Sequence, residues 1–179
     1  MNNTKPVHII TKITLLLNLS YIFKSLQMEN YKNKAAIITG SAGGLGKEFA
    51  RRLLDHGCKI CISDINEQLG EQTKTEFLEI YGNQQIHFVK CDVRRQEEVK
   101  NLFKQAKEYF NVDQIDLLVN NAGVTDSDKF DWRMIIEINY MGVMNGTTTA
   151  MEEMSNIGGT VINVASVLGL FCAGRPKGS

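Results

Sequence analysis

Short apolar runs alternate with longer segments of helical periodicity from Lys34 onward, and this alternation restricts the possible folds more than any other feature of the chain. Apolar runs of this length, bounded by glycine or polar residues, are typical of buried strands. Strands and helices in strict alternation build a parallel sheet that is covered by helices on both faces. We therefore predict an α/β fold in three layers (α/β/α) around a doubly wound parallel sheet. The predicted strands are 35–39, 59–64, 86–89, 115–119 and 159–164, and the predicted helices are about 45–56, 66–81, 99–110 and 130–154.

The first 28 residues differ from the rest because they contain three lysines and no acidic residue. Their longest uncharged run, Ile13–Phe23, has eleven residues, whereas a membrane-spanning helix needs roughly 20. Two interpretations stay open: a poorly ordered extension, or a targeting segment such as a signal peptide or a basic membrane-surface helix. We predict an extension over 1–28 and one domain over 29–179, with no stable membrane span and the cytoplasm as the default location.

Composition and cysteine usage exclude several classes of protein. The 20 Lys and Arg residues balance 20 Asp and Glu residues, so a nucleic-acid partner is not expected. Four cysteines are too few for a disulfide scaffold, and the three histidines are scattered, so no metal site is predicted. Cys58 and Cys61 have C-x-x-C spacing, but they lie in a predicted strand, where residues three apart point to opposite faces. We interpret both as buried core residues.

The first predicted strand leads directly into a glycine-rich turn and then a helix, over Thr39–Gly46. Glycines here let the backbone approach a pyrophosphate closely, and the start of the helix supplies free N–H groups and a partial positive charge. The alternative is a tight turn that needs glycine only for its positive φ. We predict a phosphate cradle that consists of Gly40, Ser41, Ala42, Gly44, Leu45 and Gly46.

Asp64 ends the second predicted strand, 18 residues after Gly46, and Ile65 follows it. An acidic side chain at this place can accept hydrogen bonds from the adenosine ribose hydroxyls of a dinucleotide. It would repel a 2′-phosphate, and no Lys or Arg directly follows it, so we predict NAD rather than NADP. The alternative is an N-cap for the helix that begins near Asn66, and one carboxylate can do both.

Four motifs in order resemble the short-chain dehydrogenase/reductase family: Thr39–Gly46, Cys91-Asp92-Val93, Asn120-Asn121-Ala122-Gly123 and Ile138-Asn139. The resemblance covers about 34–169 and implies a Rossmann-like dinucleotide-binding domain. It implies that Asp92, flanked by Cys91 and Val93, lies near the adenine amino group. It also implies that Asn120, Asn121, Ala122 and Gly123 bind the cofactor, with Asn121 and Gly123 in the wall near the nicotinamide. Asn139 corresponds to the family's structural and proton-relay Asn, and Ser166 to its catalytic Ser.

Within this family the sequence is similar to the NAD-dependent hydroxyprostaglandin dehydrogenases and the insect alcohol-dehydrogenase-like members. The likeness rests on 91–93, 120–124 and 138–147. It implies an oxidoreductase that interconverts a secondary alcohol and a ketone by hydride transfer, with a hydroxy-lipid, a prostaglandin-like molecule or a small alcohol as substrate. It also implies a homo-oligomer for the full-length enzyme.

The sequence departs from the family pattern after Ser166. The family has a Tyr-x-x-x-Lys pair about a dozen residues later, in which the tyrosine is the general acid/base, whereas 167–179 contains no tyrosine. We therefore expect a truncated form that is inactive as given, with the strand at 159–164 left as an exposed edge. Two alternatives stay open: a non-catalytic NAD-binding fragment or regulatory isoform, and a different Rossmann enzyme that uses a nucleotide sugar or a methyl donor.

Overall fold

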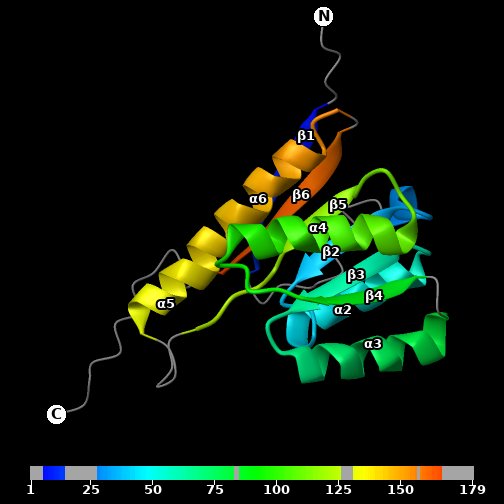
Figure 1. The fold of residues 1–179 in the computed structure, drawn as a ribbon, viewed down its shortest axis with the longest axis horizontal. Coiled ribbons are helices and arrows are strands. Elements are labelled where there is room, and N and C mark those ends of the chain that lie inside the picture. The colour runs from blue at the N-terminus through cyan, green and yellow to red at the C-terminus, as the bar shows by residue number, and fades with distance from the viewer. Residues whose placement is uncertain (1–5, 15–27, 83–84, 126–130, 157, 167–179) are drawn as a thin grey trace, which may run out of the picture.

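A six-stranded, all-parallel sheet forms the centre of the molecule in the computed structural model, which describes residues 6–14, 28–82, 85–125, 131–156 and 158–166 (Figure 1). The strands lie in the order β1-β6-β5-β2-β3-β4. The α/β fold predicted from the alternating pattern is therefore confirmed. The strands are β1 (Val7–Thr14), β2 (Ala35–Thr39), β3 (Lys59–Asp64), β4 (Ile86–Lys90), β5 (Leu117–Asn120) and β6 (Gly159–Ser166).

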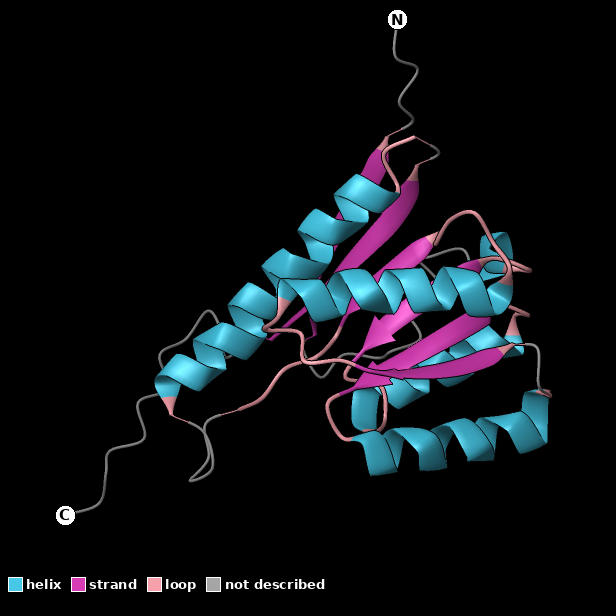
Figure 2. Ribbon diagram, viewed as in Figure 1, coloured by secondary structure: helices cyan, strands magenta, loops and turns pink. Residues whose placement is uncertain are grey.

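Helices cover both faces of this sheet (Figure 2). On one face, α2 and α3 contribute Phe49, Leu53 and Phe77 to a buried cluster with Ile60 and Ile62 of β3. On the other, α4 and α6 pack on the alternate strand residues. The two cores follow from the strand period of two, which sends neighbouring side chains to opposite faces. The helices are η1 (Met28–Tyr31), α2 (Gly44–Asp55), α3 (Glu67–Tyr81), α4 (Gln96–Phe110), α5 (Trp132–Ile136), η2 (Glu137–Met141) and α6 (Gly142–Glu153).

The helix predicted at 130–154 is interrupted by a wider turn. Residues 132–153 are helical throughout, but η2 is a π-helical segment between two α-helical ones. A π-helical turn inserts an extra residue into the helix and is frequent at functional sites. Asn139, which the sequence singled out, lies in this segment.

The N-terminal segment forms a strand that the sequence analysis did not predict. Residues Val7–Thr14 pair in parallel with β6, in register from Val7 opposite Gly159 to Thr14 opposite Ser166. The expectation that β6 would be an exposed edge is therefore wrong, because β6 is paired on one side with β1 and on the other with β5. The sequence of β1 is rich in β-branched residues, which suit a strand, and the unpaired backbone groups of an edge attract a further strand.

The C-x-x-C pair consists of core residues, as predicted. Cys58 lies in the core cluster under α2 and α3, and Cys61 in the cluster on the opposite face. Burial raises the pKa of the Cys58 thiol to about 12 and also raises the pKa of Cys61. The third buried thiol, Cys91, has its pKa raised to about 12, chiefly by burial. Thiols of this kind are unreactive, because the thiolate is the nucleophile.

We expect a Cys172→Ser variant, which removes the fourth cysteine, to show no thiol reactive toward an aromatic disulfide reagent in the native state. The three buried thiols should all react in urea, because unfolding removes the burial that suppresses the thiolate. A titration of released chromophore with and without urea measures both numbers. Release of one equivalent from the native variant would show that a buried cysteine is accessible.

Candidate functional site

A cavity of about 530 Å³ opens at the carboxyl ends of the parallel strands. Its walls come from the segments that follow β2, β3, β4 and β5, together with Val164 of β6 and two apolar residues, Met134 and Ile138, of α5 and η2. Ligands of open parallel α/β sheets bind at this end of the strands. The cavity therefore lies where the predicted motifs converge.

The start of α2 faces this cavity. Gly43 is its N-cap and makes no side-chain capping hydrogen bond, so the first N–H groups of the helix are left without that partner. Gly44 has a φ of +53° and lines the cavity, and a Cβ atom built on it would meet no described atom within 4 Å. This backbone is therefore open to a close approach by an anion.

Three residues of the predicted cradle support the turn and do not line the cavity. Ser41 is fully buried, where its hydroxyl donates to Ile38 O at 2.6 Å and accepts from Ser63 N at 3.0 Å. Ala42 and Gly46 are also buried. Gly40, Gly44 and Leu45 line the cavity, and so does Gly43, which the sequence analysis did not include.

The carboxylate of Asp64 is fixed at the cavity wall by two backbone N–H groups. Oδ2 accepts from Ala42 N at 3.2 Å, and Oδ1 accepts from Asn66 N at 3.0 Å. The alternative that Asp64 is the N-cap of α3 is wrong, because the side chain of Asn66 caps that helix by accepting from Leu69 N. Asp64 therefore keeps further acceptor sites on its carboxylate for a ligand. Ile65 lines the cavity beside it.

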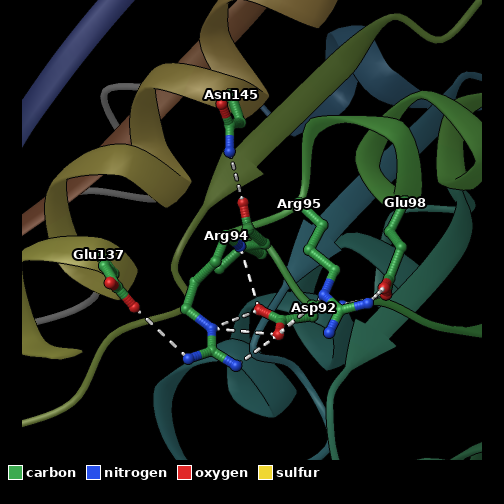
Figure 3. Close-up of polar contacts among 7 residues, drawn as sticks. Asp92, Arg94, Arg95, Glu98, Glu137 and Asn145 are labelled. Carbon is green, nitrogen blue, oxygen red and sulfur yellow. Dashed lines mark hydrogen bonds and ion pairs between the residues drawn. The ribbon is translucent and has the colours of Figure 1, made fainter.

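Asp92 lies two residues after the end of β4, and its carboxylate is held by two nitrogens of Arg94, which the sequence analysis missed (Figure 3). Arg94 Nε donates to Asp92 Oδ1 at 2.9 Å, and Nη2 donates to Oδ2 at 2.6 Å. These hydrogen bonds lower the pKa of the Asp92 carboxyl below its ordinary value, so the group is an anion at neutral pH. Cys91, Asp92, Val93 and Arg94 all line the cavity.

The two asparagines at the end of β5 have different roles. Asn120 is buried, and its side chain donates to Asn163 Oδ1 at 2.9 Å and to Thr147 Oγ1 at 3.2 Å, which joins β5 to β6 and α6. Asn121 lines the cavity, and its side chain donates to the carbonyl groups of Thr39 at 3.0 Å and Gly40 at 2.8 Å. Asn121 thus holds the glycine-rich turn against the segment after β5.

Ala122, Gly123 and Val124 continue this wall of the cavity. Ala122 N donates to Thr39 Oγ1 at 3.1 Å. The side chain of Asn139 makes two hydrogen bonds of 2.8 Å with the backbone of Val124, one to its N–H and one to its carbonyl group. The π-helical segment therefore fixes the far end of this wall.

Ser166 is the last residue of β6 and is exposed. It does not line the cavity, which receives only Val164 from this strand. The tail at 167–179, in which the sequence analysis found no tyrosine, lies outside the described residues. The structure thus brings together Asp64, Asp92 and the two glycine-containing turns, but it does not bring Ser166 into the same cavity.

Most of the chain is similar to short-chain dehydrogenases. The family model for short chain dehydrogenases matches residues 34–175. The NAD(+) 15-hydroxyprostaglandin dehydrogenase of Mus musculus is 37% identical over 142 residues, which are 77% of this chain and 51% of the relative. The 3beta-hydroxysteroid dehydrogenase 2 of Eggerthella lenta is 36% identical over 151 residues, 79% of this chain and 56% of the relative.

Solved structures show the same likeness. A short chain dehydrogenase/reductase from Burkholderia phymatum, in complex with NAD, matches with a TM-score of 0.69 and 30% identity over 79% of this chain and 52% of that chain. A short chain dehydrogenase from Mycobacterium smegmatis matches with a TM-score of 0.70 and 32% identity over 79% of this chain and 61% of that chain. The present chain spans about half the length of the curated relatives it matches.

Among the residues with described positions, no helix has the length and apolar character needed to cross a bilayer.

Proposed function

The chain belongs to the short-chain dehydrogenase family, as its motifs predicted, and on this basis we propose that the cavity binds NAD and that the whole protein interconverts a secondary alcohol and a ketone. The observation that carries the proposal is the Asp64 carboxylate, fixed at the cavity wall by two backbone N–H groups beside the uncapped start of α2. A carboxylate and a helix N-terminus side by side suit a ribose diol and a pyrophosphate.

Each part of the cavity suits one part of NAD. The backbone of Gly44 and the first turn of α2 would receive the pyrophosphate, and Asp64 the adenosine ribose. Asp92 would accept from the adenine amino group, and Asn121 and Gly123 would flank the nicotinamide side. When bound, NAD accepts the hydride in alcohol oxidation, and the protein supplies binding and orientation.

For the substrate we propose a hydroxy-lipid or another small secondary alcohol. The names of two relatives, a hydroxyprostaglandin and a hydroxysteroid dehydrogenase, support this class. In the whole protein, Ser166 would donate a hydrogen bond to the substrate oxygen, and Asn139 would support the proton relay as well as the turn it holds. We also propose that the whole protein is a homo-oligomer, as its resemblance to the family implies.

A second candidate function is NAD binding without turnover. It is favoured by the sequence after Ser166, where 167–179 contains no tyrosine to act as general acid/base. A ligand-binding assay and a turnover assay on the same preparation separate the two candidates. NAD binding with no NADH formed from a panel of secondary alcohols supports the second, and NADH formation supports the first.

The proposed cofactor is tested by thermal and urea unfolding of the 179-residue chain with NAD, NADP, a nucleotide sugar and S-adenosylmethionine. A site that binds NAD gives about 2.7 kcal/mol of added stability at a hundredfold excess over the Kd. We expect this increase with NAD and a smaller one with NADP, because the anionic Asp64 repels the 2′-phosphate. No increase with any dinucleotide would refute the proposed function.

Asp64→Asn is expected to weaken NAD binding roughly tenfold, since hydrogen bonds to a charged group contribute about 1.5–3 kcal/mol. It should also narrow the preference for NAD over NADP, because the repulsion disappears while the side chain keeps its shape. Calorimetric titration of both cofactors measures the two effects. Asp113→Asn is the charge-matched control, because Asp113 is exposed and lies outside the cavity lining. An unchanged ratio of the two Kd values in Asp64→Asn would contradict the assignment.

A further inference from the structure

Arg94, in the segment after β4, lies between Asp92 and Glu137 (Figure 3). Arg94 forks the Asp92 carboxylate with its Nε and Nη2 atoms, at 2.9 and 2.6 Å. Its third nitrogen, Nη1, lies 3.6 Å from Glu137 Oε2, on the first residue of η2. The three charges thus form a row in which the central cation is shared by two carboxylates.

The row continues along η2 to the opposite wall of the cavity. Asn139 is two residues after Glu137 and holds the N–H and carbonyl groups of Val124, both at 2.8 Å. Val124 lies in the wall that follows β5. The path from Asp92 through Arg94, Glu137 and Asn139 to Val124 therefore runs around the cavity from the end of β4 to the end of β5.

Contacts that do not involve Arg94 also hold this segment in place. Asn145 Nδ2 of α6 donates to Val93 O at 2.9 Å. Gly142 packs so closely on the same residue that a Cβ there would lie 2.7 Å from Val93 Cγ2. The backbone of Val93 is thus docked on α6 independently. What Arg94 adds is the orientation of the Asp92 carboxylate and the link to η2.

We infer that Arg94 is a positioning residue for the dinucleotide: it aims the Asp92 carboxylate into the cavity and, through Glu137, fixes the adenine end relative to the wall after β5. This inference rests on the proposed function, since it assumes NAD as the ligand. The Asp92 side chain is 11% exposed and that of Arg94 is 31% exposed, so the fork is partly shielded from water. The Glu137 side chain is 56% exposed, so its link is weaker.

The two halves of the row predict different effects on two ligands. ADP carries only the adenine half of NAD, so it depends on Asp92 but not on the distance to the opposite wall. Arg94→Gln should weaken both NAD and ADP roughly tenfold, as expected for the loss of a charge-assisted fork. Glu137→Gln leaves the fork intact, so it should weaken NAD roughly two- to fivefold, the range of an exposed ion pair, and leave ADP unchanged.

The experiment is a calorimetric titration of the full chain and its variants with NAD and with ADP, after each variant's unfolding curve has been recorded. Arg52→Gln and Glu97→Gln are the matched controls, because they remove the same charges from exposed positions that do not line the cavity, Arg52 in the last turn of α2 and Glu97 in the first turn of α4. Both should bind NAD and ADP as the unmodified chain does. Arg94→Lys keeps the charge but loses the planar fork, and its Kd values should lie between those of the unmodified chain and Arg94→Gln.

The outcomes separate this inference from the proposed function. If the unmodified chain binds neither NAD nor ADP, the proposed function fails, and the inference with it. If the unmodified chain binds NAD, and Arg94→Gln and Arg94→Lys bind it with the same Kd as the unmodified chain, only the inference is overturned. Equal weakening of NAD and ADP by Glu137→Gln would also overturn it, because a general loss of structure lowers both affinities together, whereas a link between two walls affects only the ligand that spans them.

Discussion

Gly46→Ala is expected to lower the free energy of unfolding by about 3 kcal/mol and to abolish NAD binding. A Cβ at this position would collide with the carbonyl oxygen of Gly40 and would lie 2.5 Å from Asn121 Nδ2 and 2.8 Å from Ser41 Cα. Two of these atoms are backbone, so the turn itself must shift. The shift would also break the hydrogen bond from Asn121 to Gly40 that holds the two walls of the cavity together.

Gly43→Ala is the matched control for this prediction. Its Cβ would have only an ordinary contact, 3.7 Å from Leu69 Cδ2, and its backbone is extended, with a φ of −159°. We expect its unfolding free energy to fall by no more than about 1 kcal/mol, the cost of alanine at an N-cap. Urea unfolding followed by circular dichroism measures both variants. Equal stabilities would show that the turn is looser than its packing indicates.

Asn120→Ala is expected to lower the free energy of unfolding by about 2 kcal/mol. It removes a buried donor shared by Asn163 and Thr147 and leaves a void beside Gly146, which is packed directly against the Asn120 side chain. The loss removes the side-chain link of β5 to β6 and α6 at the carboxyl end of the paired strands, so this end of the sheet should open first. Hydrogen exchange of the β5 and β6 amides, together with urea unfolding, measures the effect.

Asn101→Ala is the control, because Asn101 is exposed on α4. Alanine has the higher helix propensity, so this variant should be as stable as the original chain or slightly more stable. An Asn120→Ala variant no less stable than Asn101→Ala would contradict the role given to the buried amide.

The strands from β2 to β6 were predictable because each is a short apolar run. Such a run is the main sequence signal of a buried parallel strand. The place of Asp64 at the cavity wall was predictable because it ends such a strand after a glycine-rich turn. Asn120 and Asn121 could not be told apart in sequence, since both follow the same apolar run. Only the packing of α6 against β5 decides that the first is buried and the second lines the cavity.

Arg94 was missed for a different reason. Its partner Asp92 is two residues away, but its other partner, Glu137, is far along the chain, and ion pairs of this kind leave no periodic signal. The strand β1 was missed because its eight residues carry no glycine-rich turn or helix after them in the described chain, and its partner is among the last described residues. Local patterns identify elements, whereas contacts between distant residues follow only from the assembled fold.

The pairing of β1 with β6 has a consequence for the order of folding. Val7 lies opposite Gly159, a separation of 152 residues, whereas β2 and β3 are joined by one short helical crossover. Closing a longer loop costs more chain entropy, and contacts between distant residues form slowly. We therefore expect the four strands from β2 to β5 to assemble first and β1 to dock last, on a sheet edge that the rest of the chain has already built.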